Sequence, residues 1–164
     1  MSALQLVFAA ALTTLLAGVV LFTAFTVRVA LTDRPTAARG RWIERIGRAG
    51  DRDVQRWAFV AHRSTGVAVF AFLLLHVFDV ALYTVSPARF DDVHELYGTT
   101  PMRVFECLLL FAILFHTFNG LRLVVLDVVE VPLSTARRLL HVALGLTAVA
   151  GVLASVVILK PVLA

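Results

Sequence analysis

Four long apolar runs, each near the length that crosses a lipid bilayer, constrain this chain more than any other feature. They extend over about 4–27, 57–85, 102–129 and 141–159, and a helix needs about 20 apolar residues to span the hydrocarbon core. Only 16% of the residues are charged, whereas about a quarter are charged in a typical soluble domain. The sequence therefore predicts an all-α membrane protein with four transmembrane helices.

The first run, 4–27, is N-terminal and rich in alanine, as a secretory signal peptide would be. It lacks a basic n-region, however, and it is longer than the apolar segment of about 7–15 residues that such peptides carry. We therefore expect a transmembrane helix over 1–31, an arginine-rich cytoplasmic loop over 32–56 and a domain with the three other helices over 57–164.

Arginine residues are unevenly distributed between the loops. The 32–56 loop holds many, and Arg137 and Arg138 precede the last run, whereas the 86–101 loop holds few. Because short cytoplasmic loops are rich in Lys and Arg, we expect both basic loops in the cytoplasm and both termini outside. This topology explains the net charge of +4, so we expect no nucleic-acid partner.

Ionisable side chains inside the predicted spanning helices are candidate functional residues, because charged groups are costly in lipid. The second run holds His76 and Asp79, and the third holds Glu106, His116 and Arg122. Neutral imidazole is a good iron ligand, and a membrane bundle offers the dry slot that a porphyrin requires. His76 and His116 are therefore candidate axial ligands of b-type haem. A histidine hydrogen-bonded to a neighbouring helix is the alternative for each.

The two histidines differ in their surroundings and their depth. His76 is flanked by apolar residues, and His116 shares a helix face with Gly120, four residues later. A missing side chain at Gly120 would leave room for a flat porphyrin. Counting about 1.5 Å per residue places His76 nearer the outside and His116 nearer the cytoplasm. Two haems at different levels are favoured, and one shared haem is the alternative.

Arg122 lies about 9 Å along the helix from His116. A guanidinium group binds carboxylates in a bidentate way, so a haem propionate is a natural partner for it. Pairing with Asp127 or snorkelling to the interface are the alternatives.

Two motifs resemble those of a known family. Residues 61–66 read Ala-His-Arg-Ser-Thr-Gly, and residues 116–122 read His-Thr-Phe-Asn-Gly-Leu-Arg, followed by Asp127. Their spacing is similar to the motifs His-Arg-x-(Ser/Thr)-Gly and His-x-x-x-Gly-x-Arg-x-x-x-x-Asp. From about Trp57 onward, the chain thus resembles the cytochrome b membrane-anchor subunit of succinate dehydrogenase (succinate:quinone oxidoreductase), of the dihaem type.

The resemblance implies that the three helices of 57–164 form a haem-binding anchor bundle and that the N-terminal helix is additional to it. It also implies a subunit that catalyses nothing alone. Such anchors pair with a second membrane-anchor subunit and hold a flavoprotein, which oxidises succinate, and an iron–sulfur protein on the cytoplasmic side of a prokaryotic plasma membrane. It implies that His116 ligates one haem b and His76 another, with the partner anchor completing each ligand pair. Electrons would pass to a quinone in the bilayer, and two haems usually accompany menaquinone.

The resemblance also assigns Arg63 to the neighbourhood of a quinone site, but a serine expected four residues earlier is here Phe59. The lining of that proximal site is therefore open. His62 is a candidate hydrogen-bonding partner of quinone or of a haem propionate, or an interfacial structural residue. If quinone is instead reduced near the outer face, Asp79 and Glu106 are candidates for a proton relay, with structural hydrogen bonding as the alternative.

Two other functions remain open from the sequence. One is a cytochrome b subunit of a different quinone-linked complex, such as a hydrogenase or a formate dehydrogenase, although those tend to pair their histidines within one chain. The other is a haem-free anchor or transporter-like bundle whose histidines are structural or carry protons.

Overall fold

The computed structural model describes residues 1–32, 51–129 and 131–163. Four helices in these ranges are long and apolar enough to cross a membrane, which confirms the predicted fold class. They are α1 (Ala3–Thr32), α3 (Asp51–Val85), α5 (Thr100–Val128) and α6 (Leu133–Leu163). The described residues contain no strand.

Two short helices connect α3 to α5. Ser86 is extended and caps α4 (Pro87–His94), with Pro87 in the first turn, where a missing backbone N–H costs nothing. The 3-10 helix η1 (Glu95–Gly98) follows. Thr99 then caps α5, and its hydroxyl donates to the Leu96 carbonyl at 2.7 Å. Helix α3 thus ends where the second predicted apolar run, 57–85, ends.

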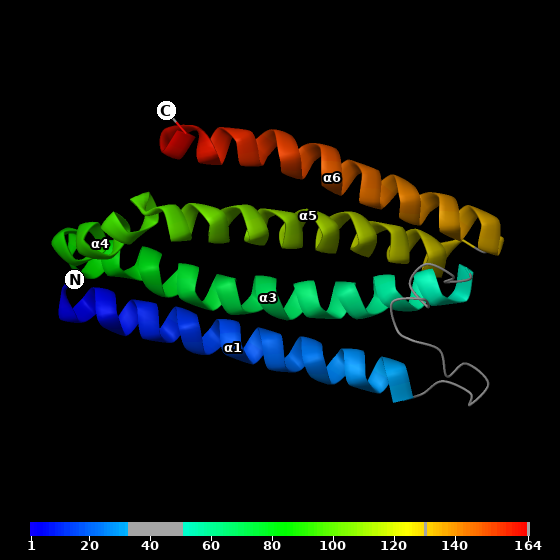
Figure 1. Cartoon of the computed structure of the whole chain (residues 1–164), viewed down its shortest axis with the longest axis horizontal. Helices are drawn as coiled ribbons and strands as arrows, with labels where there is room; N and C mark the ends of the chain where they lie inside the picture. Colours follow the sequence, from blue (N-terminus) through cyan, green and yellow to red (C-terminus); the bar gives the residue numbers. More distant parts are fainter. Residues whose placement is uncertain (33–50, 130, 164) are drawn as a thin grey trace.

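The long helices lie side by side in chain order, as Figure 1 shows. The main contacts join α1 to α3, α3 to α5, and α5 to α6. Both chain ends lie toward α4, and we call this side the α4 end. The opposite side, where α3 and α6 begin and Arg137 and Arg138 lie, is called the arginine end.

Two helices begin earlier than the apolar runs predict. The α3 helix starts at Asp51, so residues 51–56 of the predicted loop are helical, and α6 starts at Leu133 rather than near His141. A hydropathy pattern marks only the part of a helix that meets lipid, whereas helical hydrogen bonding continues into the polar interface. The rest of the predicted arginine-rich loop, 33–50, lies outside the described residues.

The additional helix α1 lies at the edge of the row and is fastened to the α4 end. Phe8 is buried with Leu75 of α3, Val93 of α4 and Met102 of α5. The Ser2 hydroxyl donates to the Asp92 carboxylate, and Gln5 Nε2 donates to the Asp92 carbonyl at 2.8 Å. The N-terminal helix is therefore packed into the fold at this end.

Candidate cofactor site

Near the arginine end, α3 and α5 bring two histidines into direct contact. The rings of His62 and His116 stack, with centroids 4.1 Å apart and planes within 1° of parallel. The lone pair of an imidazole nitrogen lies in the plane of its ring. In two stacked, parallel rings the lone pairs therefore lie in separate parallel planes and do not point toward one another. In this arrangement the two imidazoles cannot bind one iron atom from opposite faces.

Hydrogen bonding sets the tautomer of His116. Its Nδ1 lies 3.1 Å from the backbone carbonyl oxygen of His62 and 3.5 Å from the Thr65 hydroxyl. Because a carbonyl oxygen can only accept, Nδ1 carries the proton in this contact, and Nε2 keeps its lone pair. Metal-binding histidines are commonly held in this way, with one nitrogen bonded to a carbonyl and the other facing the metal.

Two glycines make room for the histidine rings. A Cβ atom added at Gly66 would lie 2.8 Å from His116 Cε1, and one added at Gly120 would lie 3.3 Å from His62 Cε1. Each glycine thus faces the ring from the opposite helix. The space that Gly120 leaves is filled by His62, whereas the sequence predicts that it receives a porphyrin.

Arg122 is 5% exposed and joins three helices. Its guanidinium donates to Gln55 Oε1 of α3, to Asn119 Oδ1 of α5 at 3.1 Å, and to the Ala136 carbonyl of α6 at 3.2 Å. Among the residues that the structure describes, no carboxylate pairs with Arg122, and Asp127 is exposed. Its buried positive charge therefore meets only neutral oxygens here.

Unpartnered polar atoms gather around the same residues. Asn119 is fully buried, and its Nδ2 donor has no partner within the described chain; the same holds for Nδ1 of His62. Buried polar groups without partners are uncommon and costly. A polar or anionic group from outside the chain would satisfy them.

His76 lies on the same helix as His62 but far from it. Fourteen residues of α3 separate them, which is about 21 Å of helix rise. Because His62 stacks on His116, one haem cannot be bound by both His76 and His116. The His76 ring is exposed on the outside of the row and stacks on Phe72 at 5.5 Å.

Arg63 points away from the stacked histidines. It is exposed, and its guanidinium lies 5.3 Å from the Phe59 ring centroid, in cation–π geometry. Phe59 is itself 52% exposed. Arg63 and Phe59 thus form an exposed pair near the arginine end.

A second polar group lies at the α4 end. Asp79 is 2% exposed, its Oδ2 accepts a hydrogen bond from the Tyr97 hydroxyl at 3.2 Å, and its Oδ1 has no partner among the described residues. His94 Nδ1 lies 3.9 Å from Asp79 Oδ2. Burial, followed by the charge of Asp79, raises the pKa of Tyr97, so its phenol remains a hydrogen-bond donor at all ordinary pH values.

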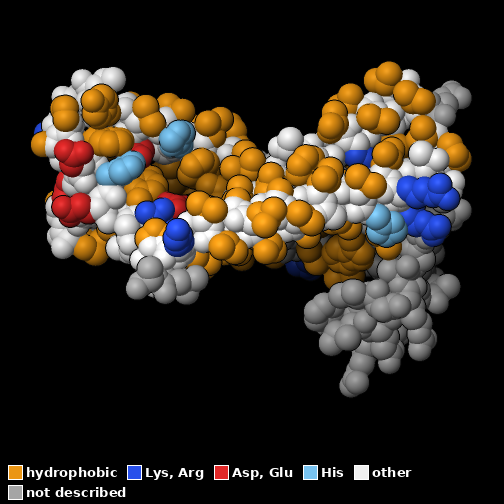
Figure 2. All heavy atoms as spheres, turned by 90° about the horizontal axis from the view of Figure 1, so that it is seen from above, with side chains coloured by type: hydrophobic (Ala, Val, Ile, Leu, Met, Phe, Trp, Pro, Cys, Tyr) orange, Lys and Arg blue, Asp and Glu red, His pale blue; other side chains and the backbone are white. Residues whose placement is uncertain are grey.

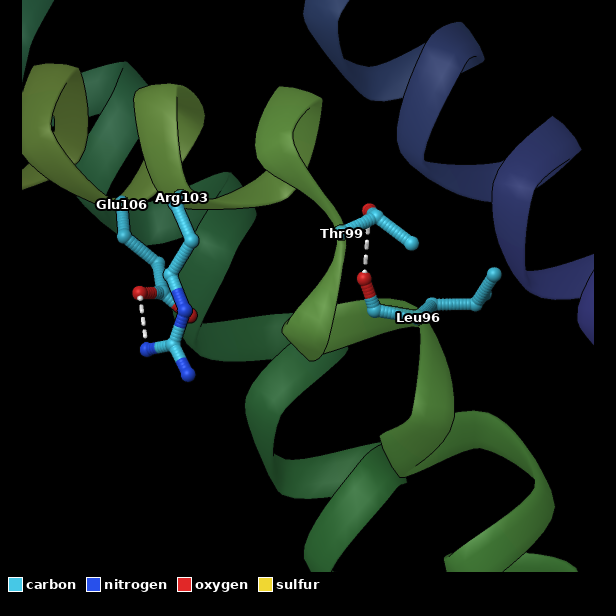
Figure 3. A network of polar contacts seen from close by, with 4 residues as sticks. All are labelled: Leu96, Thr99, Arg103 and Glu106. Carbon is cyan, nitrogen blue, oxygen red and sulfur yellow. Dashed lines mark hydrogen bonds and ion pairs between the residues drawn. The ribbon is translucent and has the colours of Figure 1, made fainter. Parts of the chain in front are cut away.

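Glu106, the other predicted relay carboxylate, has different surroundings. It accepts a hydrogen bond from Arg103 at 3.1 Å, on the side of α5 away from α1, as Figure 3 shows. In the described chain it shares no hydrogen bond with Asp79. On the face seen in Figure 2, the acidic side chains gather in the half of the molecule that contains α4, and basic side chains dominate the far end.

An apolar cavity of about 140 Å³ lies between the two polar regions. It is lined by residues of α1, α3 and α5, among them Leu15, Phe72, Leu75 and Phe105. The His62–His116 site and the Asp79 group are thus separated by apolar side chains.

Several site residues were missed by the sequence analysis. Gln55 and Tyr97 gave no signal, because an amide at a helix start and a tyrosine in a loop have ordinary solvated positions. Gly66 was considered only as the last residue of the 61–66 motif. Its position four residues after His62, on the same face of the helix, could have predicted a close contact with a neighbouring helix. His94 was not singled out as a partner of Asp79, and its side chain is 51% exposed.

These features define the class of protein: a membrane-spanning anchor of four helices with buried polar sites at two depths. The model of the succinate dehydrogenase/fumarate reductase transmembrane subunit family matches residues 41–154, and the chain belongs to this family. It is 38% identical over 96 residues to succinate dehydrogenase 2 membrane subunit SdhC of Mycobacterium tuberculosis, a match that covers 58% of this chain and 69% of that protein. Helix α1 lies outside the family match, in agreement with its description as additional.

Proposed function

We propose that this membrane subunit carries haem b and passes electrons from an iron–sulfur partner to quinone, within a succinate:quinone oxidoreductase. The observation that carries the proposal is the tautomer of His116, whose Nδ1 is bonded to the His62 carbonyl at 3.1 Å. This leaves Nε2, the nitrogen that imidazole offers to haem iron, as a lone-pair donor inside the bilayer region.

The residues around His116 fit a haem. Arg122 offers a buried cation to a propionate. Asn119, three residues from Arg122 on α5, and His62, whose ring stacks on His116, each have a buried nitrogen without a partner in the described chain. A propionate would replace neutral contacts of the guanidinium with a charge-assisted pair, which is roughly twice as strong as a neutral hydrogen bond. When bound, the haem supplies one-electron chemistry, while these residues position it and balance its charge.

The second axial ligand of this haem comes from another chain in our proposal. His62 is stacked on His116 and so cannot bind the opposite face of its iron. A second membrane-anchor subunit seated against α3 and α5 would supply that ligand. The same partner would cover His76, whose exposed ring lies about 21 Å along α3 from His62 and would bind a second haem.

The arginine end faces the cytoplasm of a prokaryotic cell in this proposal, with the flavoprotein and the iron–sulfur protein docked there. The positive-inside rule supports this orientation. The exposed pair Arg63 and Phe59 would contribute to a quinone site near the iron–sulfur partner, and menaquinone is the quinone that two haems favour. Succinate is oxidised on the flavoprotein, so this chain is the electron-transferring part of the enzyme.

Haem content of the purified complex tests the proposal. The wild type should hold two haems per complex, and His76→Ala and His116→Ala should each hold one. His141→Ala is the matched control, because His141 is exposed near the start of α6, and its haem content should equal that of the wild type. Unchanged content in both test variants, or no b-type band in the dithionite-reduced minus oxidised spectrum, would favour a haem-free anchor.

A further inference from the structure

The additional helix α1 and helix α5 lie on either side of α3, as Figure 1 shows. The main contacts of α1 are with α3 and α4, whereas those of α5 are with α3, α6 and η1. At the α4 end, Phe8 of α1 and Met102 of α5 are buried together with Leu75 of α3. The apolar cavity of about 140 Å³ is lined by residues of the same three helices, so α1 contributes one of its walls.

The cavity extends along the helix axes. Its lining residues lie within 12–19 of α1, 68–75 of α3 and 105–112 of α5. Each of these ranges corresponds to about 10 Å of helix rise. The space is therefore shaped for a ligand that is longer than it is wide and that lies parallel to the helices.

The lining of the cavity joins the interior to the surface. Leu75 and Leu109 line it and are each 8% exposed, whereas Leu16 and Leu108 also line it and are exposed. All of them belong to helices that are long and apolar enough to cross a membrane. The cavity thus reaches from the buried part of the bundle to the side that meets lipid.

Only hydrocarbon suits this space. The described residues that line it are all Leu, Val, Ala or Phe, whereas a buried water needs about two to four polar partners. Apolar cavities of about 150 Å³ stay dry and bind molecules such as benzene. An empty space would leave the lining side chains without contact atoms on one side, so a hydrocarbon ligand stabilises the cavity.

The acyl chain of a phospholipid is the hydrocarbon that the cavity favours. A transmembrane helix is about 10–12 Å in diameter with its side chains, which is too wide for this space. The isoprenoid tail of a quinone is also hydrocarbon, but the described lining offers no polar group that would hold the quinone ring. Without such selection, the most abundant hydrocarbon of the bilayer occupies the site.

The depth of the cavity matches the end of an acyl chain. Residues 12–19 begin about 14 Å from Ala3 and end about 20 Å from Thr32, the first and last residues of α1. The hydrocarbon core of a bilayer is about 30 Å thick, so an acyl chain extends about 15 Å from the interface to the middle. Its terminal part reaches the cavity while the headgroup stays at the interface.

We propose that the cavity between α1, α3 and α5 binds the terminal part of one phospholipid acyl chain, which enters beside Leu16 and Leu108. The chain contacts all three helices and so helps to hold the additional helix against the bundle. This inference goes beyond the proposed function and does not depend on haem.

Photolabelling of the intact complex tests the proposal. The complex is reconstituted in vesicles of phosphatidylcholine and phosphatidylglycerol, part of which carries a diazirine at the end of one acyl chain. Illumination should label Leu75 and Leu109, whose low exposure keeps them from lipid outside the cavity, and tandem mass spectrometry locates the label. Leu153, an exposed residue of α6, measures labelling from the surrounding bilayer. Label at Leu153 without label at Leu75 and Leu109 would overturn the inference.

Variants that change the size of the cavity sharpen this test. Ala71→Leu places a larger side chain in the lining and should lose the label at Leu75 and Leu109. Ala148→Leu, the same change at an exposed position of α6, should keep it. Leu15→Ala widens the cavity and should raise the label, which separates filling of the space from misfolding. Wild-type label in Ala71→Leu, or loss of label in Leu15→Ala, would contradict the proposal.

Unlabelled menaquinone added to the vesicles separates the two sources of hydrocarbon. If an acyl chain occupies the cavity, the quinone should lower the label at Leu75 and Leu109 no more than at Leu153. A selective loss at Leu75 and Leu109 would overturn the assignment to phospholipid and give the cavity to the isoprenoid tail.

Discussion

At the arginine end, Arg122 and His116 donate to oxygens that belong to α3, α5 and α6, all of them long helices. At the α4 end, Asp79 is held by a single phenol from the short helix η1, with a half-exposed imidazole nearby. The first group is therefore fixed by the packing of the membrane-spanning helices. The second depends on a connecting segment and on the N-terminal helix that covers it.

Ligation of a cofactor requires a ring in one orientation and one tautomer, which several rigid contacts provide. The arginine end has such contacts, and the α4 end has few. The cavity between the two regions is lined by apolar side chains, so it offers no hydrogen-bonded path for a proton between them within the described chain.

The largest effect is expected for Arg122→Leu. The change removes three hydrogen bonds and leaves Asn119 Oδ1, Gln55 Oε1 and the Ala136 carbonyl short of a donor, each at a cost of about 1–3 kcal/mol. The complex should lose stability by several kcal/mol and lose the haem near His116. Thermal dissociation followed at the haem band measures both. Arg89→Leu, at an exposed site of α4, should change neither, and equal losses in the two variants would contradict the buried role of Arg122.

A smaller effect is expected for Gly66→Ala. The new Cβ would lie 2.8 Å from His116 Cε1, so the ring must swing and give up its contact with the His62 carbonyl. Overpacking of this kind costs about 1–3 kcal/mol, and the haem near His116 should be bound more weakly while that near His76 is retained. Gly145→Ala meets no atom within 4 Å and should behave as the wild type. Equal haem spectra of the two variants would show that the glycine contact is not needed.

The fold was predictable because lipid imposes a simple rule on the sequence: apolar runs of sufficient length become helices. The second apolar run, 57–85, ends at the same residue as α3. The starts of α3 and α6 were missed because Asp51, Leu133 and their polar neighbours lie beyond the hydrocarbon, where hydropathy no longer reports on helix formation.

The sites were predictable only in part, because partners across helices depend on rotation about the helix axis. Spacing marked His116 and Gly120 as neighbours on one helix face, but it could not show that the ring of His62 fills the space that Gly120 leaves. The structure places His116, in contact with His62, nearer the arginine end than His76, and the side of the membrane that each end faces stays a prediction. The separation of about 21 Å along α3 is that between His62 and His76. It describes the distance between the levels of His116 and His76 only because His116 is in contact with His62.

Tyr97→Phe tests the weaker support at the α4 end. The variant loses one hydrogen bond to Asp79, worth about 0.5–1.5 kcal/mol, and keeps the ring contact with Phe8. Stability should fall by about that amount, and haem content should be unchanged. Phe90→Leu, which alters an aromatic contact of His94 without touching Asp79, is the comparison. A loss of several kcal/mol in Tyr97→Phe would mean that the α4 end is as tightly fixed as the arginine end.

The smallest structural effect is expected for Glu106→Gln. The ion pair with Arg103 spans three residues of one helix, and both side chains are partly exposed, so its loss should cost less than about 0.5 kcal/mol. A role in proton relay predicts that quinone reduction nevertheless slows, since glutamine cannot carry a proton. Asp91→Asn, at the same end and exposed, should leave the rate as it is in the wild type. An unchanged rate in Glu106→Gln would remove this carboxylate from the relay.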